Sequence, residues 1–167
     1  MRILLVILFL MSSAFSQTPP IEPGASHDLA KWRSARYSDV RYKLNLTLEK
    51  MSPVLKGTME IRVNVRDMSV PPAVAGGSAP IILDWRKIKG YEEKSTIRKV
   101  SINGRSGTQN SFEESNEHLI FRDGVVIGEN VIKLDFTSPI LTSGSAITRY
   151  VDKEDGGGIY LLAFCPE

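Results

Sequence analysis

The side chains that could carry catalysis or bind a metal are few in this chain of 167 residues, and they lie far apart. The sequence contains two histidines, His27 and His118, and one cysteine, Cys165. A zinc hydrolase of the His-Glu-x-x-His type needs two histidines one helical turn apart and a carboxylate base beside them. The two histidines here fit no such spacing, and one cysteine allows neither an internal disulfide nor a cysteine-rich zinc site.

Two acidic residues beside His118 raise the alternative of a different metal site. Glu114, Glu117 and His118 look like ligands, but they belong to a stretch rich in Ser, Asn and Glu. That composition is typical of a solvated loop. We therefore expect no metal here, with residues 109–117 as a polar loop, His118 at the edge of a strand and His27 exposed at the start of a helix.

Nucleophilic and phosphate-binding motifs are also missing. The sequence has no Gly-x-Ser-x-Gly elbow and no histidine near Cys165, so we expect a structural thiol there. The glycines at 156–158 follow Asp152, Glu154 and Asp155, which would repel a phosphate, and they precede a strand pattern where a phosphate loop precedes a helix. They predict a hairpin tip. A weak calcium contact by the three acids is the alternative, although the twelve-residue calcium loop is absent.

One modification motif is present. Asn45, Leu46 and Thr47 match the acceptor pattern for N-glycosylation. Asn45 is expected on the wetted face of a strand, which leaves room for a glycan. Whether it is used depends on the host, and a chance match is the default interpretation.

Composition and charge narrow the class of protein. With 42% hydrophobic and 24% charged residues, the chain is neither a disordered tail, a collagen-like rod nor a disulfide-rich miniprotein. The formal net charge of +2 is spread evenly along the sequence. Nucleic-acid binders cluster their basic residues, so we expect no nucleic-acid partner.

The first sixteen residues predict a secretory signal peptide. Arg2 precedes an apolar run over residues 3–11, and Ala14 and Ser16 fit the small residues required before a cleavage site. The run is too short to cross a bilayer core of about 30 Å, although a retained N-terminal anchor is the alternative. We therefore expect a secreted or periplasmic protein that begins near Gln17 and has no membrane span after cleavage.

The rest of the chain predicts a short helix followed by antiparallel strands. Residues 17–24 form a proline-rich lead, and Ser26 can cap a helix over His27–Arg36 that is anchored by Trp32. From residue 40 the apolar residues alternate, which predicts two long strands joined as a hairpin, each with one buried face. The first strand would bury Val40, Tyr42, Leu44, Leu46 and Leu48; the second would bury Gly57, Met59, Ile61, Val63 and Val65.

Further strands are expected over residues 81–83, 97–102, 119–121, 131–136 and 159–164, separated by a Pro- and Gly-rich loop at 71–80 and a tight turn at Asn103 and Gly104. Seven or eight strands without a long intervening helix or a fixed repeat favour an all-β, antiparallel sandwich. We therefore expect a single domain over residues 25–167.

Several sequence blocks, taken in order, resemble the N-terminal domain of the aminopeptidase N family, the zinc-dependent membrane alanyl aminopeptidases. The first strand and its lead, the Gly-Thr-Met-Glu-Ile strand and the Gly-Glu-Asn-Val-Ile strand carry much of the similarity. The matching blocks are residues 29–36, 39–44, 56–61, 83–84, 100–104, 128–134, 147–150, 155–156 and 160–166. In their order and spacing they span nearly all of the chain expected after the signal peptide.

The resemblance implies a saddle-like β-sandwich that covers and orients a zinc-containing catalytic domain. In that family the zinc ligands, the general-base Glu and the Gly-x-Met-Glu-Asn loop lie beyond the part that matches, so none can be assigned here. We therefore expect a non-catalytic scaffold or lid, truncated before the catalytic domain, that holds no zinc itself and meets peptides only through that partner domain. Many members place Glu or Gln where this chain has Cys165, which makes Cys165 a substrate contact by resemblance alone, since a thiol lacks the charge of a carboxylate.

A stand-alone extracellular β-sandwich that binds carbohydrate or protein is the alternative. All-β folds host many functions, so the fold does not exclude it. A carbohydrate-binding module would display grouped exposed aromatic side chains, whereas Trp32 and Trp85 lie in segments expected to face the core.

Overall fold

The computed structural model describes residues 18–66, 80–106, 112–154 and 156–163, and these residues form an all-β fold with antiparallel sheets. The elements are α1 (His27–Arg36), β1 (Tyr37–Thr47), β2 (Val54–Val65), β3 (Ile81–Asp84), the 3-10 turn η1 (Glu92–Lys94), β4 (Thr96–Ile102), β5 (Arg105–Ser106), β6 (Glu113–Ser115), β7 (His118–Phe121), β8 (Gly128–Pro139), β9 (Ile147–Asp152) and β10 (Gly158–Ala163). The all-β prediction is confirmed. The signal peptide, most of the loop at 71–80, Asp155 and Cys165 lie outside the described residues.

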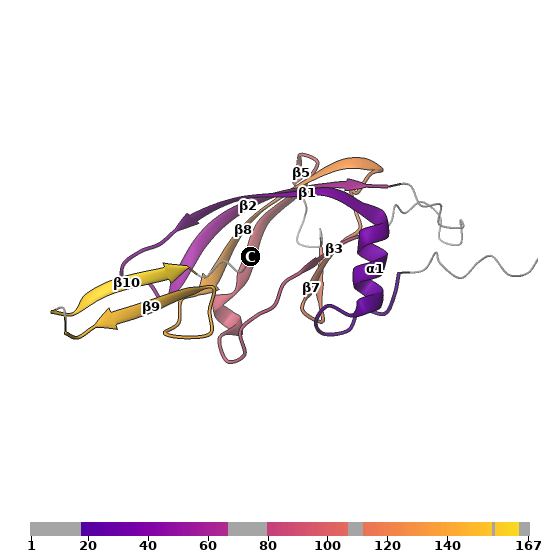
Figure 1. Cartoon of the computed structure of the whole chain (residues 1–167). Helices are drawn as coiled ribbons and strands as arrows, with labels where there is room; N and C mark the ends of the chain where they lie inside the picture. The colour runs from indigo at the N-terminus through magenta and orange to yellow at the C-terminus, as the bar shows by residue number, and fades with distance from the viewer. Residues whose placement is uncertain (1–17, 67–79, 107–111, 155, 164–167) are drawn as a thin grey trace, which may run out of the picture.

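The largest sheet has five antiparallel strands in the order β1-β2-β8-β4-β5 and arches along the molecule (Figure 1). Its first two strands form the hairpin that the alternation predicts, with Tyr42 opposite Ile61 and Leu44 opposite Met59. Residues directly opposite each other point to the same face of an antiparallel pair. The apolar residues of β1 and β2 therefore share one face, as predicted.

A three-stranded sheet, β3-β7-β6, lies against this apolar face, which we call the inner face; the opposite side is the outer face. Ile81 and Ile82 of β3 are buried on opposite sides of the strand, as predicted for an apolar run covered twice. The main core lies between the two sheets. It contains Ile61, Val63, Val65, Val100, Ile102, Ile132 and Leu134 from the large sheet and Ile81, Leu119 and Phe121 from the small one.

Helix α1 covers the other side of the three-stranded sheet (Figure 1). It begins where predicted, because the Ser26 hydroxyl accepts a hydrogen bond from the backbone N–H of Leu29 at 3.2 Å. Leu29 and Trp32 pack against Ile82 and Ile120. The predicted helix and its Trp32 anchor are both confirmed.

The β9–β10 hairpin lies at the other end of the molecule (Figure 1). Ile147 and Leu161 of the hairpin pack with Leu55 of β2 and with Ile140 in a small apolar cluster. Gly156 and Gly157 have φ angles of +66° and +85°, and the backbone N–H of Gly157 donates to the Asp152 carbonyl. The predicted hairpin tip is confirmed, since glycine adopts these angles without steric strain.

The structure contradicts the expected polar loop at 109–117 in part. Residues 113–115 form strand β6, which pairs with β7 through a tight turn at Asn116 and Glu117. Both turn residues have positive φ, +48° and +65°. Glycine or Asn-Gly usually marks such a turn. Because the turn here is Asn-Glu, the sequence did not indicate this hairpin. The described residues contain ten strands, more than the seven or eight expected.

Gly57 lets the ring of Phe136 lie directly against β2. A Cβ atom at this position would be 2.4 Å from both Cε1 and Cζ of Phe136, and that ring packs edge-on against Trp85. We expect Gly57→Ala to lower the free energy of unfolding by about 1–3 kcal/mol through overpacking, measured by urea denaturation. The loss should shrink in a Phe136→Leu background; an equal loss in both backgrounds would contradict this explanation.

Tyr37 joins β1 to β3. Its hydroxyl donates to the Pro80 carbonyl at 2.7 Å and accepts from the backbone N–H of Ile82 at 3.0 Å. Burial raises the pKa of Tyr37 to about 12, against smaller lowering effects from the Ile82 hydrogen bond and from nearby arginines.

This raised pKa makes stability depend on alkaline pH. The unfolded tyrosine loses its proton near pH 10, whereas the folded one retains it to about pH 12. The stabilisation is thus complete below pH 10 and is lost as the pH rises to 12, amounting to about 2–3 kcal/mol. Denaturation series in this window should show a smaller alkaline loss for Tyr37→Phe than for the wild type; parallel curves would contradict the assignment.

Candidate functional site: an open apolar face and its polar borders

The most unusual surface is the apolar side of β1, which nothing among the described residues covers. Tyr42, Leu44 and Leu46 point to the inner face but are 61%, 51% and 40% exposed. Leu48 and Met51, just after the strand, are also exposed. We call these five residues the open face.

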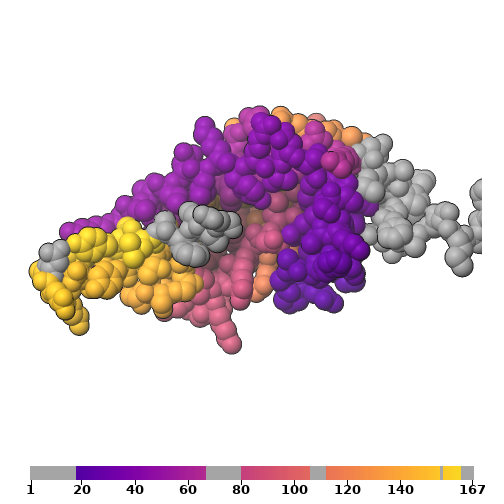
Figure 2. Space-filling view, in the orientation of Figure 1, coloured from indigo at the N-terminus to yellow at the C-terminus, as the bar shows by residue number. Residues whose placement is uncertain are grey.

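The open face corrects the prediction that β1 is buried on one side. The alternation identified the side correctly, but Val40, Tyr42, Leu44, Leu46 and Leu48 are all exposed. The reason is the size of the second layer, because β3, β6 and β7 have only four, three and four residues. The main core takes side chains from β2, β4 and β8, but from β1 only Tyr37 joins it. This side of the molecule is hollowed between β1 and α1 (Figure 2).

A charged cluster borders the open face. Arg33 of α1 donates two hydrogen bonds to Asp84 at the end of β3, at 2.8 and 3.1 Å. On the other side, Nε2 of His118 lies 3.2 Å from Oδ1 of the same carboxylate. Partial burial, followed by the Asp84 charge, raises the pKa of Tyr42, with Arg33 acting in the opposite direction. Tyr42 is thus the residue through which the open face meets this cluster.

His118 is the first residue of β7, at the edge of a strand as predicted. The sequence did not predict that its side chain is fully buried, because β7 is the middle strand of the three-stranded sheet. Its Nδ1 lies 2.5 Å from the Asn116 carbonyl oxygen, so the other ring nitrogen is the one directed at Asp84. These contacts tie α1, β3 and β7 together, a structural role. His27 is exposed at the first position of α1, as predicted.

The acidic residues that resembled a metal site have separate partners. Glu114 forms an ion pair with Lys87 at 2.5 Å, and Glu117 lies 3.8 Å from Arg86. Near the β9–β10 tip, the Asp152 carboxylate accepts from the Glu154 backbone N–H. Within the ranges that the structure describes, no three His, Cys, Asp or Glu side chains gather as a metal site.

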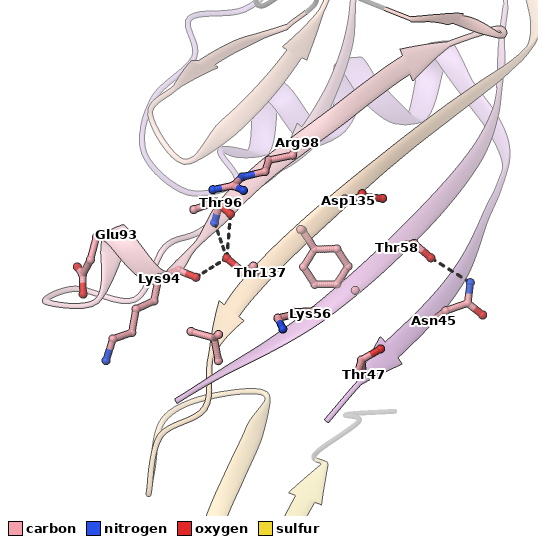
Figure 3. Close-up of a pocket in the computed structure, with 13 residues that line it drawn as sticks. Asn45, Thr47, Lys56, Thr58, Glu93, Lys94, Thr96, Arg98, Asp135 and Thr137 are labelled. Carbon is pink, nitrogen blue, oxygen red and sulfur yellow. Dashed lines mark hydrogen bonds between the residues drawn. The ribbon is translucent and has the colours of Figure 1, made fainter. Parts of the chain in front are cut away.

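The outer face carries a polar groove of about 530 Å³ (Figure 3). The hydroxyl of Thr137 donates to the Lys94 carbonyl at 2.7 Å and accepts from the Thr96 backbone N–H at 3.2 Å. Asn45, exposed as predicted, donates to the Thr58 hydroxyl at 3.2 Å. Other lining residues carry charges of both signs: Lys56, Glu93, Lys94, Arg98 and Asp135. Since the lining mixes charges of both signs with two hydrogen-bonded pairs, Asn45–Thr58 and Thr96–Thr137, the groove gives no preference for one ligand chemistry.

The sequence predicted the residues of the open face but not the charged cluster at its border. The alternation identified the residues of the open face, whereas nothing local to Asp84 or His118 indicated that they would meet. Cys165, the one substrate contact inferred by resemblance, lies outside the described residues.

In the part of the chain that the structure describes, no helix has the length and apolar character needed to cross a membrane. No family model matches the chain, and no curated protein matches it.

Proposed function

We propose that this chain is a non-catalytic β-domain that docks onto a catalytic domain and orients it, and that the partner is a zinc aminopeptidase domain of the kind implied by the resemblance to aminopeptidase N. The saddle-like sandwich and an extracytoplasmic location belong to the same proposal. The observation that carries it is the open face. Contiguous exposed apolar surface bordered by polar groups is typical of interaction sites in soluble proteins.

The open face suits a partner domain better than a small ligand. It lies along one extended strand, where three alternate side chains stand in a row, each more than a third exposed. A small-molecule site is usually a concave cavity that surrounds its ligand. A row of side chains along an edge strand instead matches a broad partner surface, with the Arg33–Asp84 pair at its border.

The open face should bind an apolar dye until a partner covers it. We expect Leu44→Lys to reduce the fluorescence of bound anilinonaphthalene sulfonate several-fold without loss of stability, because Leu44 is already half exposed. Val151→Lys, at a similarly exposed apolar residue of the β9–β10 hairpin, is the matched control and should leave most of the signal. Equal dye binding by all three proteins would contradict the docking role of this face.

The identity of the partner can be tested at the gene. Reading all frames of the genomic locus beyond codon 167 should reveal His-Glu-x-x-His and Gly-x-Met-Glu-Asn motifs. The product of that longer reading frame should bind zinc and release N-terminal residues from peptides, whereas the 167-residue chain should do neither. A locus without these motifs, or one tightly bound zinc per 167-residue chain, would contradict the aminopeptidase proposal.

One observation favours the stand-alone binding module as a second candidate. Tyr150 and Tyr160 lie opposite each other on the β9–β10 hairpin, 53% and 44% exposed, with ring centroids 6.4 Å apart. Exposed aromatic rings can stack on sugar rings. A glycan array should separate the two candidates. Glycan binding that is lost in Tyr150→Ala would support the binding module, whereas no glycan binding by the wild type would count against the carbohydrate-binding module and favour the docking domain.

A further inference from the structure

Strand β1 has a free edge as well as an open face. Among the described strands it pairs with β2 alone, so the backbone groups on its other edge have no strand partner. Every residue of β1 from Asp39 onward is exposed. Unpaired edges of this kind readily accept a further strand.

The bulge that protects the edge is confined to one end of β1. The pairing with β2 is irregular between Ser38 and Arg41, and Asp39 there has a φ angle of +52°. Bulges of this kind discourage edge pairing. From Arg41 to Thr47 the register is uninterrupted, which leaves seven residues of regular strand.

We propose that a second copy of this chain pairs antiparallel with this edge, about a two-fold axis through Asn45. The two five-stranded sheets would then form one continuous sheet across the axis. The proposal goes beyond the docking function, because it uses the edge of β1 and leaves the open face directed at a partner domain.

The side chains of β1 and of the two residues after it favour this register. With the axis at Asn45, pairing that extends past Thr47 places Glu49 of the second copy opposite Arg41 on the outer face, where the two opposite charges would exchange their present partners, Lys56 and Asp39. On the inner face, Leu44 lies opposite Leu46 of the second copy and Tyr42 opposite its Leu48. All three cross-strand pairs are therefore complementary.

Neighbouring registers are less favourable. An axis at Lys43 would place that ammonium group directly opposite itself, and an axis at Leu44 would place Asp39 opposite Glu49 of the second copy. Like charges directly opposite each other destabilise a strand pair. The charge pattern thus disfavours these two alignments. An axis at Leu46 would place Lys43 opposite Glu49, but it would place Tyr42 opposite Lys50, where the axis at Asn45 places Tyr42 opposite Leu48.

Cysteine cross-linking tests the alignment directly. In a Cys165→Ser background, Asn45→Cys places two thiols opposite each other across the axis, where antiparallel strands bring Cα atoms within about 4.5–5.5 Å, inside the range for a disulfide. We expect mild oxidation to convert most of this variant to a covalent dimer. Sedimentation velocity should show the unmodified wild-type chain as a dimer at micromolar concentration.

Lys43→Cys in the same background is the matched control. It lies on the same exposed outer face but would stand opposite Thr47 of the second copy, so its two thiols would be four residues apart, or about 14 Å. It should remain uncross-linked. A monomeric wild type, or equal cross-linking of both variants, would overturn the proposal.

A dimer without the Asn45→Cys cross-link would also overturn it, because two copies packed through their open faces keep Asn45, on the outer side, far from its counterpart. None of these outcomes depends on the genomic test of the aminopeptidase proposal, so the two proposals can fail separately.

Discussion

Asn130→Ala is expected to lower the free energy of unfolding by about 3–5 kcal/mol, the largest loss we predict for a polar residue. Asn130 is fully buried, and its amide group serves several backbone groups at once. Its Oδ1 accepts from the Val126 N–H at 2.9 Å, and its Nδ2 donates to the carbonyls of Val126 and Gly128 at 2.7 and 3.0 Å. Each buried group left without a partner costs about 1–3 kcal/mol.

The same side chain connects two parts of the large sheet. Asn103, in the tight turn after β4, donates to Asn130 Oδ1 at 3.0 Å and to the Gly124 carbonyl at 2.9 Å. Its own Oδ1 accepts from the Val131 N–H at 2.8 Å. The two asparagines thus fix the loop before β8 to the turn after β4, and Ala at 130 removes the hydrogen bonds of its side chain to Val126, Gly128 and Asn103.

Guanidinium denaturation followed by fluorescence measures this loss. Asn45→Ala is the control, because Asn45 is exposed on the same sheet and makes one side-chain hydrogen bond, to Thr58. It should change stability by no more than about 0.5 kcal/mol. A loss for Asn130→Ala as small as that of the control would show that the loop finds other hydrogen-bond partners.

Trp32→Ala is expected to cost a similar amount, about 3–5 kcal/mol, by removing a large buried ring. Trp32 packs between α1 and the three-stranded sheet, and its ring meets Tyr37 edge-on with centroids 5.8 Å apart. The guanidinium group of Arg36 lies 4.7 Å from the Trp32 ring centroid, which adds a cation–π contact. The helix has ten residues, too few to be stable without this packing.

The helix should therefore loosen before the sheets do. Limited proteolysis of Trp32→Ala should cleave first within α1, while far-ultraviolet circular dichroism retains its β signal. Trp32→Phe keeps an aromatic ring at the site and should lose less stability than Trp32→Ala. Uniform proteolysis throughout the chain would show that the sheets depend on α1 for their own folding.

The sequence alone determined α1, the first hairpin and the turn after β4, because their signals are local. Ser26 capped α1 as predicted, the alternation from residue 40 identified the hairpin of β1 and β2, and Asn103 with Gly104 marked a real turn. Each signal depends on backbone angles or side-chain direction within a few residues. The side of β1 that carries the apolar residues was fixed in the same way.

Whether that side is covered was decided only by the tertiary structure. Alternation records the direction of a side chain, whereas burial requires a second layer, and the short strands β3, β6 and β7 do not extend over β1. The burial of His118 against Asp84 has the same origin, since it needs β7 as the middle strand and α1 nearby. Contacts between residues distant in sequence depend on topology, which local patterns do not encode. For this reason the strand that the sequence predicted to be buried on one side forms an open face in the structure.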